Sequence, residues 1–514
     1  MADDTYSPRN IRASLQKFLL GKAITAPGTF LLVFVLATVM PGHEYAAYIA
    51  ASSGLELALA MSSLGLDWLM QTAIPSARAH GNPFQLRRLI ASLAALQTLP
   101  YVVAATVFWL AAAPMSAALG GVASPELLRI YGLILLVEGL GGRMLRDQVL
   151  SALLMQGVVQ LLSILRLLSL AIGVAYLYFA HGSITSVEIA WLEFGASALT
   201  LIAASAATLV YLSRTPAGGS TERSIARWLN RDSFRFARNA YGSFMLTICL
   251  GPELATVFVA RFLGVEATAM FGFTIRVVEQ VRRFLPMDLL WSLIRPALAG
   301  RYETLGRSYT VLSRDVTLIL RSNIILLGGA MVVFVAVGEQ LIALATLGKM
   351  ILPPLLLASF LPQILGHSVR RSLELITFVI GHSHLFLRGS FAAPVAPAIL
   401  LVLMPLMPSL YLVALGMIVA EVMFSGIVAF GLIRLGRPLS INVGQWGAFA
   451  VVVILCGGLG AFISRQWPTT PGMLGAASVA GLTYLACLPL LGVASMKDLG
   501  LLAGLARTRS NGAT

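Results

Sequence analysis

Long apolar runs recur along the whole chain, and they constrain its fold more than any other feature of the sequence. A membrane-spanning helix needs about 20 mostly apolar residues. Of the 514 residues, 58% are hydrophobic and 11% are charged, and the mean hydropathy is +0.86. A soluble domain carries about 25% charged residues. The sequence therefore predicts an all-α polytopic membrane protein without a soluble domain that could hold ordinary enzyme chemistry.

About fourteen runs reach the length of a spanning helix. Their approximate limits are 18–40, 45–65, 89–112, 127–142, 157–179, 187–212, 241–262, 267–286, 316–337, 351–369, 389–406, 410–432, 445–464 and 472–494. No cleavable signal peptide is predicted, because the first apolar run is itself long enough to span. The fourth run is short and the eleventh is rich in proline.

The basic residues test this count, because positive charge gathers in cytoplasmic loops. A cytoplasmic N-terminus places most of the 36 Lys and Arg residues inside, including Arg143, Arg146, Arg370 and Arg371, which are assigned to loops. The alternation holds to the end of the chain and predicts two cytoplasmic termini. The same rule explains the net charge of +14, so the charge is not taken as a sign of nucleic-acid binding. A basic amphipathic pattern within 213–240 predicts a surface helix on anionic membrane lipids.

Three loose matches at nearly one offset indicate an internal repeat. Residues 41–45 resemble 263–267, residues 75–79 resemble 296–300, and the Pro-Gly at position 27 has a Gly-Pro counterpart at position 251. The implied unit is six helices used twice, related by a pseudo-two-fold axis along the membrane normal. The predicted parts are an N-terminal bundle (1–212), a basic cytoplasmic linker (213–240), a C-terminal bundle (241–437), and two extra helices with a tail (438–514).

Helix-breaking residues occupy matching places in the first and seventh spans, namely Pro27, Gly28, Gly251 and Pro252. Proline removes a backbone hydrogen bond and kinks a helix, and lipid tolerates this where protein or a watery cavity satisfies the backbone. These four residues are predicted hinges beside a central cleft. The alternative is that proline is simply frequent in membrane helices.

Ionisable residues inside the spans are the main lead on function, since each costs about 2.5–3.5 kcal/mol near a helix centre on insertion scales. They are Glu56, Glu138, Arg166, Glu193, Glu253, Arg276, Glu279, Arg321 and Glu421. Arg276, Glu279 and Arg283 are spaced to form one ladder on one helix face. They either face a cleft or form a closed ion network that fastens helices together.

Arg166 and Arg321 are further candidates for the cleft, although each could pair with an acidic neighbour that the sequence does not locate. Glu138 and Glu421 are each the only acid on an apolar helix, and with Glu279 they are hypotheses for ion coupling; a buried neutral carboxylic acid is the alternative. The six histidines are placed in or near loops. We expect no metal and no cofactor, and no Gly-rich loop followed by Lys-Ser or Lys-Thr indicates ATP binding.

The opening of the chain resembles the start of the polysaccharide flippases. An amphipathic basic segment and an apolar span lead into Pro41-Gly42-His43-Glu44-Tyr45, and Leu64-Gly65-Leu66-Asp67 is similar to the Gly-Leu element after the second span. The six-plus-six repeat and the two extra helices also fit. The chain thus resembles the Wzx-type branch of the multidrug/oligosaccharidyl-lipid/polysaccharide (MOP) flippase superfamily.

This resemblance implies a non-enzymatic flippase of the bacterial inner membrane. It would move an undecaprenyl-pyrophosphate-linked oligosaccharide to the periplasmic leaflet, for exopolysaccharide or O-antigen (lipopolysaccharide) biosynthesis, with a polysaccharide polymerase and co-polymerase as candidate partners. Cleft-facing basic residues of the family are placed here on Arg276, Arg283, Arg166 and Arg321. The rivals are an ion-coupled drug antiporter like the MATE transporters, which needs a cluster of acids in the cleft, and a membrane glycosyl polymerase or ligase, which needs a large periplasmic loop.

Overall fold

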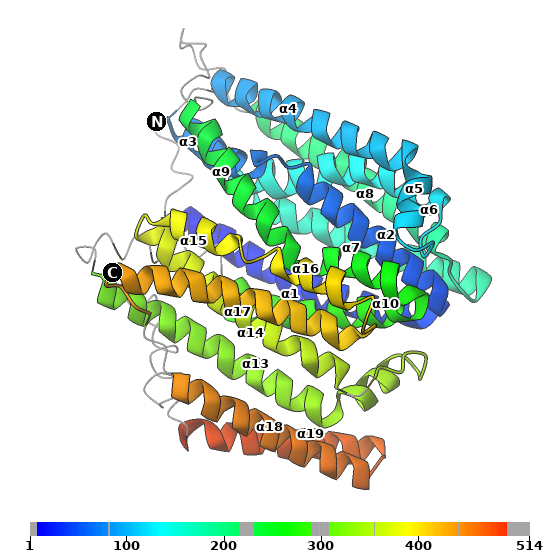
Figure 1. Cartoon of the computed structure of the whole chain (residues 1–514). Helices are drawn as coiled ribbons and strands as arrows, with labels where there is room; N and C mark the ends of the chain where they lie inside the picture. The colour runs from blue at the N-terminus through cyan, green and yellow to red at the C-terminus, as the bar shows by residue number, and fades with distance from the viewer. Residues whose placement is uncertain are drawn as a thin grey trace. The chain divides into compact units, whose positions relative to one another are not determined.

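The fold is described here from a computed structural model, which defines residues 8–80, 83–214, 231–289, 298, 302, 308–353, 355–439 and 443–490. All secondary-structure elements among these residues are helices, and turns or irregular segments connect them (Figure 1). Most of the predicted basic linker, including Arg223, Arg227 and Trp228, lies outside the described residues, so its surface helix stays a prediction. The prediction of an all-helical polytopic membrane protein is confirmed.

The chain divides into two compact units, Met1–Phe273 and Thr274–Thr514. The helices of the first unit are α1 (Pro8–Val39), α2 (Gly42–Met61), α3 (Leu66–His80), α4 (Pro83–Leu110), α5 (Ala112–Ala118), α6 (Pro125–Glu138), the π-helix η2 (Gly139–Leu150), α7 (Gln156–His181), α8 (Ser186–Arg214), α9 (Arg231–Thr247) and the short 3₁₀ helix η3 (Ile248–Leu250). Helix α10 (Pro252–Phe284) contributes to both units. The second unit continues with α11 (Pro286–Leu289), α13 (Tyr309–Ala345), α14 (Leu356–Val379), α15 (Ser383–Ser390), α16 (Val395–Leu403), α17 (Leu410–Arg434), α18 (Val443–Gln466) and α19 (Thr470–Leu490).

Ten helices among the described residues are long and apolar enough to cross a membrane, or eleven if the bent pair α2–α3 forms one span. The predicted fourth span falls on α6, which has 14 residues and continues directly into η2. The predicted tenth span falls on α14, whose C-terminal half carries three charged residues. Both predicted segments are helical, but neither is among the ten, because one is short and the other is charged.

The predicted seventh and eighth spans are divided differently from the expectation. The seventh is interrupted at Gly251, which adopts an extended backbone before Pro252 (φ −74°, ψ 147°), as expected for a residue that precedes proline. The expected turn between the two spans lies inside α10 at Gly264, whose φ of +80° is accessible to glycine and breaks the helical geometry. In the first span, α1 runs through Pro27 and Gly28 as one helix.

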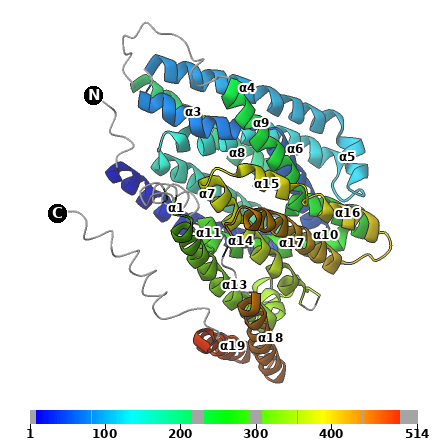
Figure 2. The ribbon, with the colours of Figure 1, turned by 60° about the vertical axis from the view of Figure 1, so that its left-hand side comes forward.

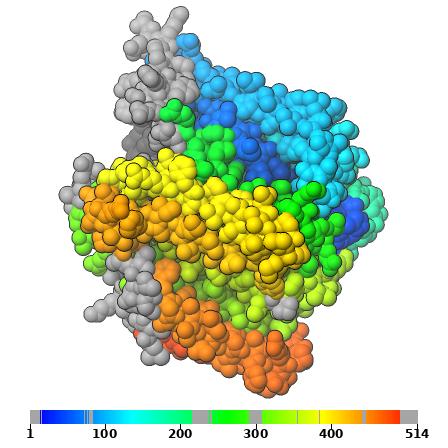
Figure 3. Space-filling view, viewed as in Figure 1, coloured from blue at the N-terminus to red at the C-terminus, as the bar shows by residue number. Residues whose placement is uncertain are grey.

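Corresponding helices have corresponding neighbours within the two units. In the first, α6 packs against α4 and α8, and α7 packs against α8. In the second, α14 packs against α13 and α17, and α16 packs against α17. The third to sixth predicted spans of each half therefore share these three contacts. Figure 3 shows α15, α16 and α17 as one continuous outer surface of the second unit.

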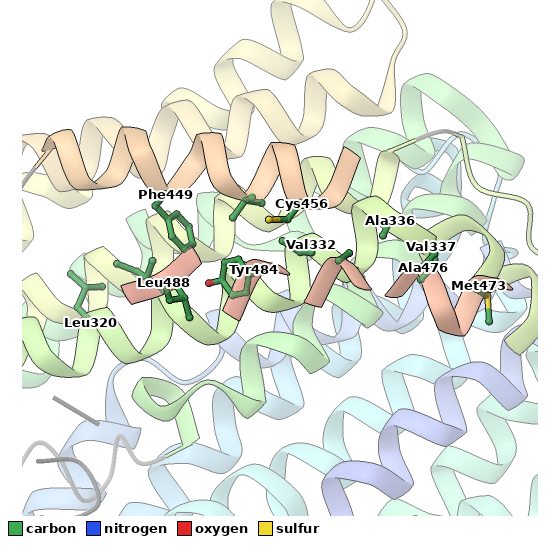
Figure 4. Packing of buried hydrophobic residues seen from close by; sticks show 13 residues of the cluster. Leu320, Val332, Ala336, Val337, Phe449, Cys456, Met473, Ala476, Tyr484 and Leu488 are labelled. Atoms are coloured by element: carbon green, nitrogen blue, oxygen red, sulfur yellow. The ribbon is translucent and has the colours of Figure 1, made fainter. Parts of the chain in front are cut away.

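The two C-terminal helices are attached to α13. They pack on it and on one another, and they lie beside it in both ribbon views (Figures 1 and 2). Their contact is an apolar cluster that includes Val332 and Ala336 of α13, Phe449 of α18 and Tyr484 of α19 (Figure 4). The Tyr484 hydroxyl also donates a hydrogen bond to the Ile325 carbonyl over 2.8 Å. The cluster places α18 and α19 on the side of α13.

Candidate functional site

A buried ion cluster joins four helices of the first unit, α6, η2, α7 and α8. Nε of Arg166 in α7 lies 3.3 Å from Oε2 of Glu138 at the end of α6. The hydroxyl of Ser197 in α8 donates to the same oxygen over 2.8 Å. Nη2 of Arg146 in η2 lies 3.9 Å from Oε1 of Glu138. The acidic neighbour of Arg166 that the sequence could not locate is therefore Glu138. The Glu138 carboxylate in turn has Arg146, Arg166 and Ser197 as polar partners.

The π-helix η2 supplies Arg146 to this cluster and the space for the Glu138 carboxylate. Arg146 forms a bidentate pair with the adjacent Asp147, with contacts of 2.7 and 3.0 Å. A Cβ atom on Gly142 would overlap the Glu138 carboxylate, and one on Gly141 would lie 2.6 Å from the Cα of Leu201. π-helices are rare and frequently lie at functional sites. Glycine at these two positions thus allows α6, η2 and α8 to approach closely around the ion cluster.

Three further polar contacts extend the cluster across the first unit. Glu193 of α8 accepts hydrogen bonds from the hydroxyls of Tyr48 and Tyr131, at 3.3 and 3.1 Å. Arg143 of η2 pairs with Glu56 of α2. All the intramembrane acids predicted in the first six spans therefore have polar partners.

A second ion cluster lies inside the second unit. Nε of Arg370 in α14 is 3.0 Å from Oε2 of Glu421 in α17, whose side chain is 1% exposed. Nη2 of Arg370 is 2.8 Å from Nδ1 of His367, and Nε2 of His367 is 3.4 Å from Oδ1 of Asp288 in α11. A Cβ on Gly366 would lie 2.8 Å from that of Glu421, so glycine permits this close approach of α14 and α17.

The second cluster continues along α14. Arg371 donates to Glu374 over 2.8 Å, and its Nε lies 3.9 Å from Oδ1 of Asp288. Burial would raise the pKa of Asp288, which lies outside the candidate spans, but its hydrogen bond with His367 and the charges of nearby histidine and arginine groups hold that pKa below its ordinary value. Asp288 is therefore a carboxylate at neutral pH.

Sequence reasoning placed several members of these clusters wrongly. It assigned Arg370 and Arg371 to a cytoplasmic loop and His367 to a loop or its vicinity, but all three lie within α14 and His367 is 5% exposed. It likewise assigned Arg143 and Arg146 to a loop, and the structure places them in η2. The i, i+4 relation of Arg370 to Glu374 was a signal that the helix continues beyond residue 369.

The predicted ladder on α10 is only partly resolved. Glu279 pairs with Arg282, Nη2 to Oε2 at 2.6 Å, a partner that the ladder did not include. Arg276 is half-buried and Arg283 is exposed, and both make polar or electrostatic interactions. Arg321 of α13 is half-buried. The roles of Arg276, Arg283 and Arg321 in a cleft between the halves stay predictions.

The predicted hinge residues occupy two different settings. Gly28 lets α1 pack closely against α7, because a Cβ there would lie 2.5 Å from the Leu167 side chain. Gly251 and Pro252 stand at a break between η3 and α10. Whether these places bend during a functional cycle stays a prediction. No three metal-ligating residues of the described part of the chain come together as a metal site.

The whole fold is similar to that of known lipid and drug transporters. No protein-family model matches the chain, and no curated protein matches it. Among solved structures, a lipid II flippase MurJ in an inward closed conformation is similar with a TM-score of 0.62 at 12% identity, over 91% of this chain and 97% of the flippase. Outward- and inward-facing structures of a multidrug resistance MATE transporter of the MOP superfamily are similar with TM-scores of 0.56 and 0.55, each at 12% identity. They cover 83% and 82% of this chain, and 95% and 98% of the transporter. The chain therefore has a MOP-like fold.

Proposed function

We propose that this protein is a flippase for an undecaprenyl-pyrophosphate-linked oligosaccharide in the bacterial inner membrane, with both termini in the cytoplasm. The observation that carries the proposal is the likeness to a lipid II flippase over 91% of the chain. The MATE structures cover 82–83%. The difference amounts to about 41–46 residues, close to the combined length of α18 and α19, which have 24 and 21 residues. A protein that handles a lipid-linked substrate is therefore the better analogue in length.

The chemistry of the substrate explains why such a protein is needed. A sugar pyrophosphate cannot cross hydrocarbon, because its water would be lost without replacement hydrogen bonds. In the proposal, the head group crosses through a polar cleft while the isoprenoid tail stays in lipid, and the halves rock to alternate access. Arginine suits pyrophosphate through paired hydrogen bonds.

Four arginines are proposed to meet the pyrophosphate: Arg276, Arg283, Arg166 and Arg321. Arg166 has a carboxylate neighbour, because its Nε lies 3.3 Å from Oε2 of Glu138. A phosphate that binds Arg166 must therefore compete with this carboxylate. In the same proposal, Glu138, Glu279 and Glu421 are the acids that link transport to an ion gradient.

The direct test is the location of the lipid-linked oligosaccharide after the gene is deleted. We expect the intermediate to accumulate on the inner leaflet, and we expect the wild-type gene to restore its transfer. Purified protein in vesicles should also move a fluorescent undecaprenyl-pyrophosphate oligosaccharide between leaflets. An unchanged distribution in the deletion strain, together with inactive vesicles, would reject the proposal.

A second candidate function is drug antiport, which the likeness to the MATE transporter favours. The same vesicles separate the two functions. Ion-driven uptake of a cationic dye without movement of the lipid-linked oligosaccharide would favour the antiporter. Movement of the lipid substrate without dye uptake would favour the flippase.

A further inference from the structure

Glu421 of α17 has a different setting from the other acids that the proposed function links to an ion gradient. The Glu138 carboxylate accepts a hydrogen bond from Ser197 and lies beside two arginines. Glu279 pairs with Arg282 over 2.6 Å. The side chain of Glu421 is 1% exposed, yet neither of its oxygens has an aligned hydrogen bond among the described residues. A buried ionised carboxylate without hydrogen bonds is costly, and this cost falls when the group takes up a proton.

Arg370, the basic neighbour of Glu421, is held by groups other than the Glu421 charge. A guanidinium has donors and no acceptor, so Nη2 of Arg370 donates to Nδ1 of His367 over 2.8 Å. The ring of Phe424 lies 5.6 Å from the guanidinium carbon, within the range of a cation–π contact. Nε of Arg370 lies 3.0 Å from Oε2 of Glu421, but it is not aligned as a hydrogen-bond donor. This geometry suits an arginine beside a neutral acid.

His367 is neutral in this arrangement. Its Nδ1 accepts from Arg370, so the ring proton is on Nε2, which faces Oδ1 of Asp288 at 3.4 Å. A second ring proton would break the bond from Arg370 and place another buried cation beside Arg370 and Arg282. A proton taken up by this cluster therefore belongs on Glu421.

The charges around Glu421 balance when Glu421 is neutral. Helices α11 and α14 contribute two carboxylates and two guanidinium groups to the cluster: Asp288, Glu374, Arg370 and Arg371. An ionised Glu421 would add one excess negative charge to this buried place. Excess charge is costly inside a protein.

The other helices near Glu421 do not change this balance. From α10, the charge of Arg282 reaches Glu421, but Arg282 is paired with Glu279. Helix α16 has no ionisable residue. Neither His384 nor Arg388 of α15 forms an ion pair with Glu421 among the described residues.

A proton suits this site better than a metal ion does. The Arg370 guanidinium, 3.0 Å from the carboxyl group, would repel a metal cation. A proton instead forms a covalent O–H bond and needs one acceptor. Ser425 stands one turn further along α17, and its buried hydroxyl oxygen has no hydrogen-bond partner among the described residues. Ser425 is therefore a candidate acceptor for the O–H group of Glu421.

We propose that Glu421 is the proton carrier of the second unit, a neutral carboxylic acid in this structure that ionises and pairs with Arg370 when the proton leaves. This inference rests on the proposed transport function for its purpose, and it names the coupling ion as a proton. On release, the O–H bond of Glu421 breaks, the proton passes to water, and the carboxylate accepts from Nε of Arg370, which stays protonated. The excess negative charge then favours a conformation that admits water to the site. Proton uptake reverses these steps.

The first test detects the proton without any transport substrate. Exposed carboxyl groups are ionised at about pH 7, so an infrared carboxylic-acid C=O band of the purified full chain at this pH reports a buried protonated acid. We expect Glu421→Gln to remove intensity from this band. Glu339→Gln, at an exposed glutamate of the same unit, is the matched control and should keep the full intensity. Glu421→Asp, which retains a carboxyl group, should keep a band at a shifted frequency. A band that Glu421→Gln leaves unchanged would overturn the proposal.

Thermal unfolding in detergent distinguishes a neutral acid from a permanent ion pair. The amide of Glu421→Gln replaces a neutral carboxylic acid of nearly the same shape, so the unfolding midpoint at about pH 7, where free carboxyl groups are ionised, should stay close to that of the wild type. Glu138→Gln removes a charge that faces two arginines in the first unit, and its midpoint should fall. An equal fall in the two variants would show that Arg370 needs the Glu421 charge, and it would overturn the proposal.

The transport measurement separates the proton carrier from the proposed function. A proton gradient should accelerate flipping of the lipid-linked oligosaccharide by the wild-type protein by about tenfold, within the usual range for coupling between sites. Glu421→Gln should lose this acceleration, and Glu339→Gln should keep it. Acceleration that persists in Glu421→Gln would reject Glu421 as the carrier while the flippase function stands. A wild-type protein that shows the Glu421 band but moves no lipid-linked oligosaccharide would instead reject the flippase function and leave the proton site in place.

Discussion

Nε of Arg166 lies 3.3 Å from Oε2 of Glu138, the same carboxylate oxygen that accepts a hydrogen bond from Ser197. The arginine and glutamate come from α7 and α6, and the serine comes from α8. Three helices of the first unit are therefore fastened through one carboxylate. The positive charge of Arg166 is not freely available to a substrate, because an incoming anion must displace Glu138.

The Arg166–Glu138 pair should show strong coupling in stability measurements. Removing one partner of a buried ion pair typically costs about 3–5 kcal/mol, because the other charge is left buried. We expect Arg166→Met and Glu138→Gln each to lower the midpoint of thermal unfolding in detergent. The double variant should recover part of the loss. Additive losses in the double variant would contradict a direct ion pair.

Arg276→Ala should abolish flipping while the protein level and membrane insertion stay unchanged. Arg276 is half-buried on α10, and the proposed function assigns it to the pyrophosphate. Arg388→Ala, at an exposed arginine of α15, serves as the control and should retain flipping. Exchange of the charges of Arg276 and Glu279 provides a further comparison. Retained flipping in the exchanged variant would favour a purely structural role for these two charges, and full activity of Arg276→Ala would remove Arg276 from the site.

Gly141→Ala should destabilise the first unit, because its Cβ would lie 2.6 Å from the backbone Cα of Leu201 in α8. Overpacking of this kind typically costs about 1–3 kcal/mol. Gly195→Ala is the matched control in α8, since nothing lies within 4 Å of its Cβ position. The thermal unfolding midpoint should fall for the first variant and not for the second. Equal midpoints would show that α8 can shift freely away from η2.

Gly328→Ala should loosen the attachment of α18 and α19 to α13. Its Cβ would overlap the Phe449 ring and the Tyr484 hydroxyl, whereas a Cβ on Gly329 would lie 3.7 Å from Tyr484. Limited proteolysis near the C-terminal helices should therefore accelerate in Gly328→Ala and not in Gly329→Ala. Tyr484→Phe, which removes the hydrogen bond to Ile325, should cost about 1 kcal/mol. Identical proteolysis of the two glycine variants would contradict the packing.

Much of the helical architecture followed from hydropathy alone, because a bilayer imposes a minimum length on every spanning helix. The sequence also located the break near Gly251 and the turn at Gly264, since glycine and proline act through local backbone geometry. The same reasoning misplaced the end of the tenth span. Their charge alone assigns Arg370 and Arg371 to a loop. In the structure both lie in a helix, and their acidic neighbours are Glu421 and Glu374.

The ion clusters could not be paired from the sequence. Glu138 and Arg166 are 28 residues apart, and Glu421 and Arg370 are 51 apart, so their contacts depend on how the helices pack. No local pattern reports which face of α14 meets α17. The π-helix was equally hidden, because its residues differ from those of an ordinary helix mainly in their hydrogen-bond register.

Attachment of α18 and α19 to α13 also has a consequence for the surrounding bilayer. Many side chains of the pair are exposed and apolar, including Ile454, Leu455, Phe462, Leu482 and Leu485. Annular phospholipids must solvate this surface, and a displacement of α13 would carry it along. Such a displacement would meet viscous drag from the lipids around α18 and α19, and it would depend on the thickness of the bilayer. The acyl-chain length of the host membrane would then affect the rate of any movement of α13.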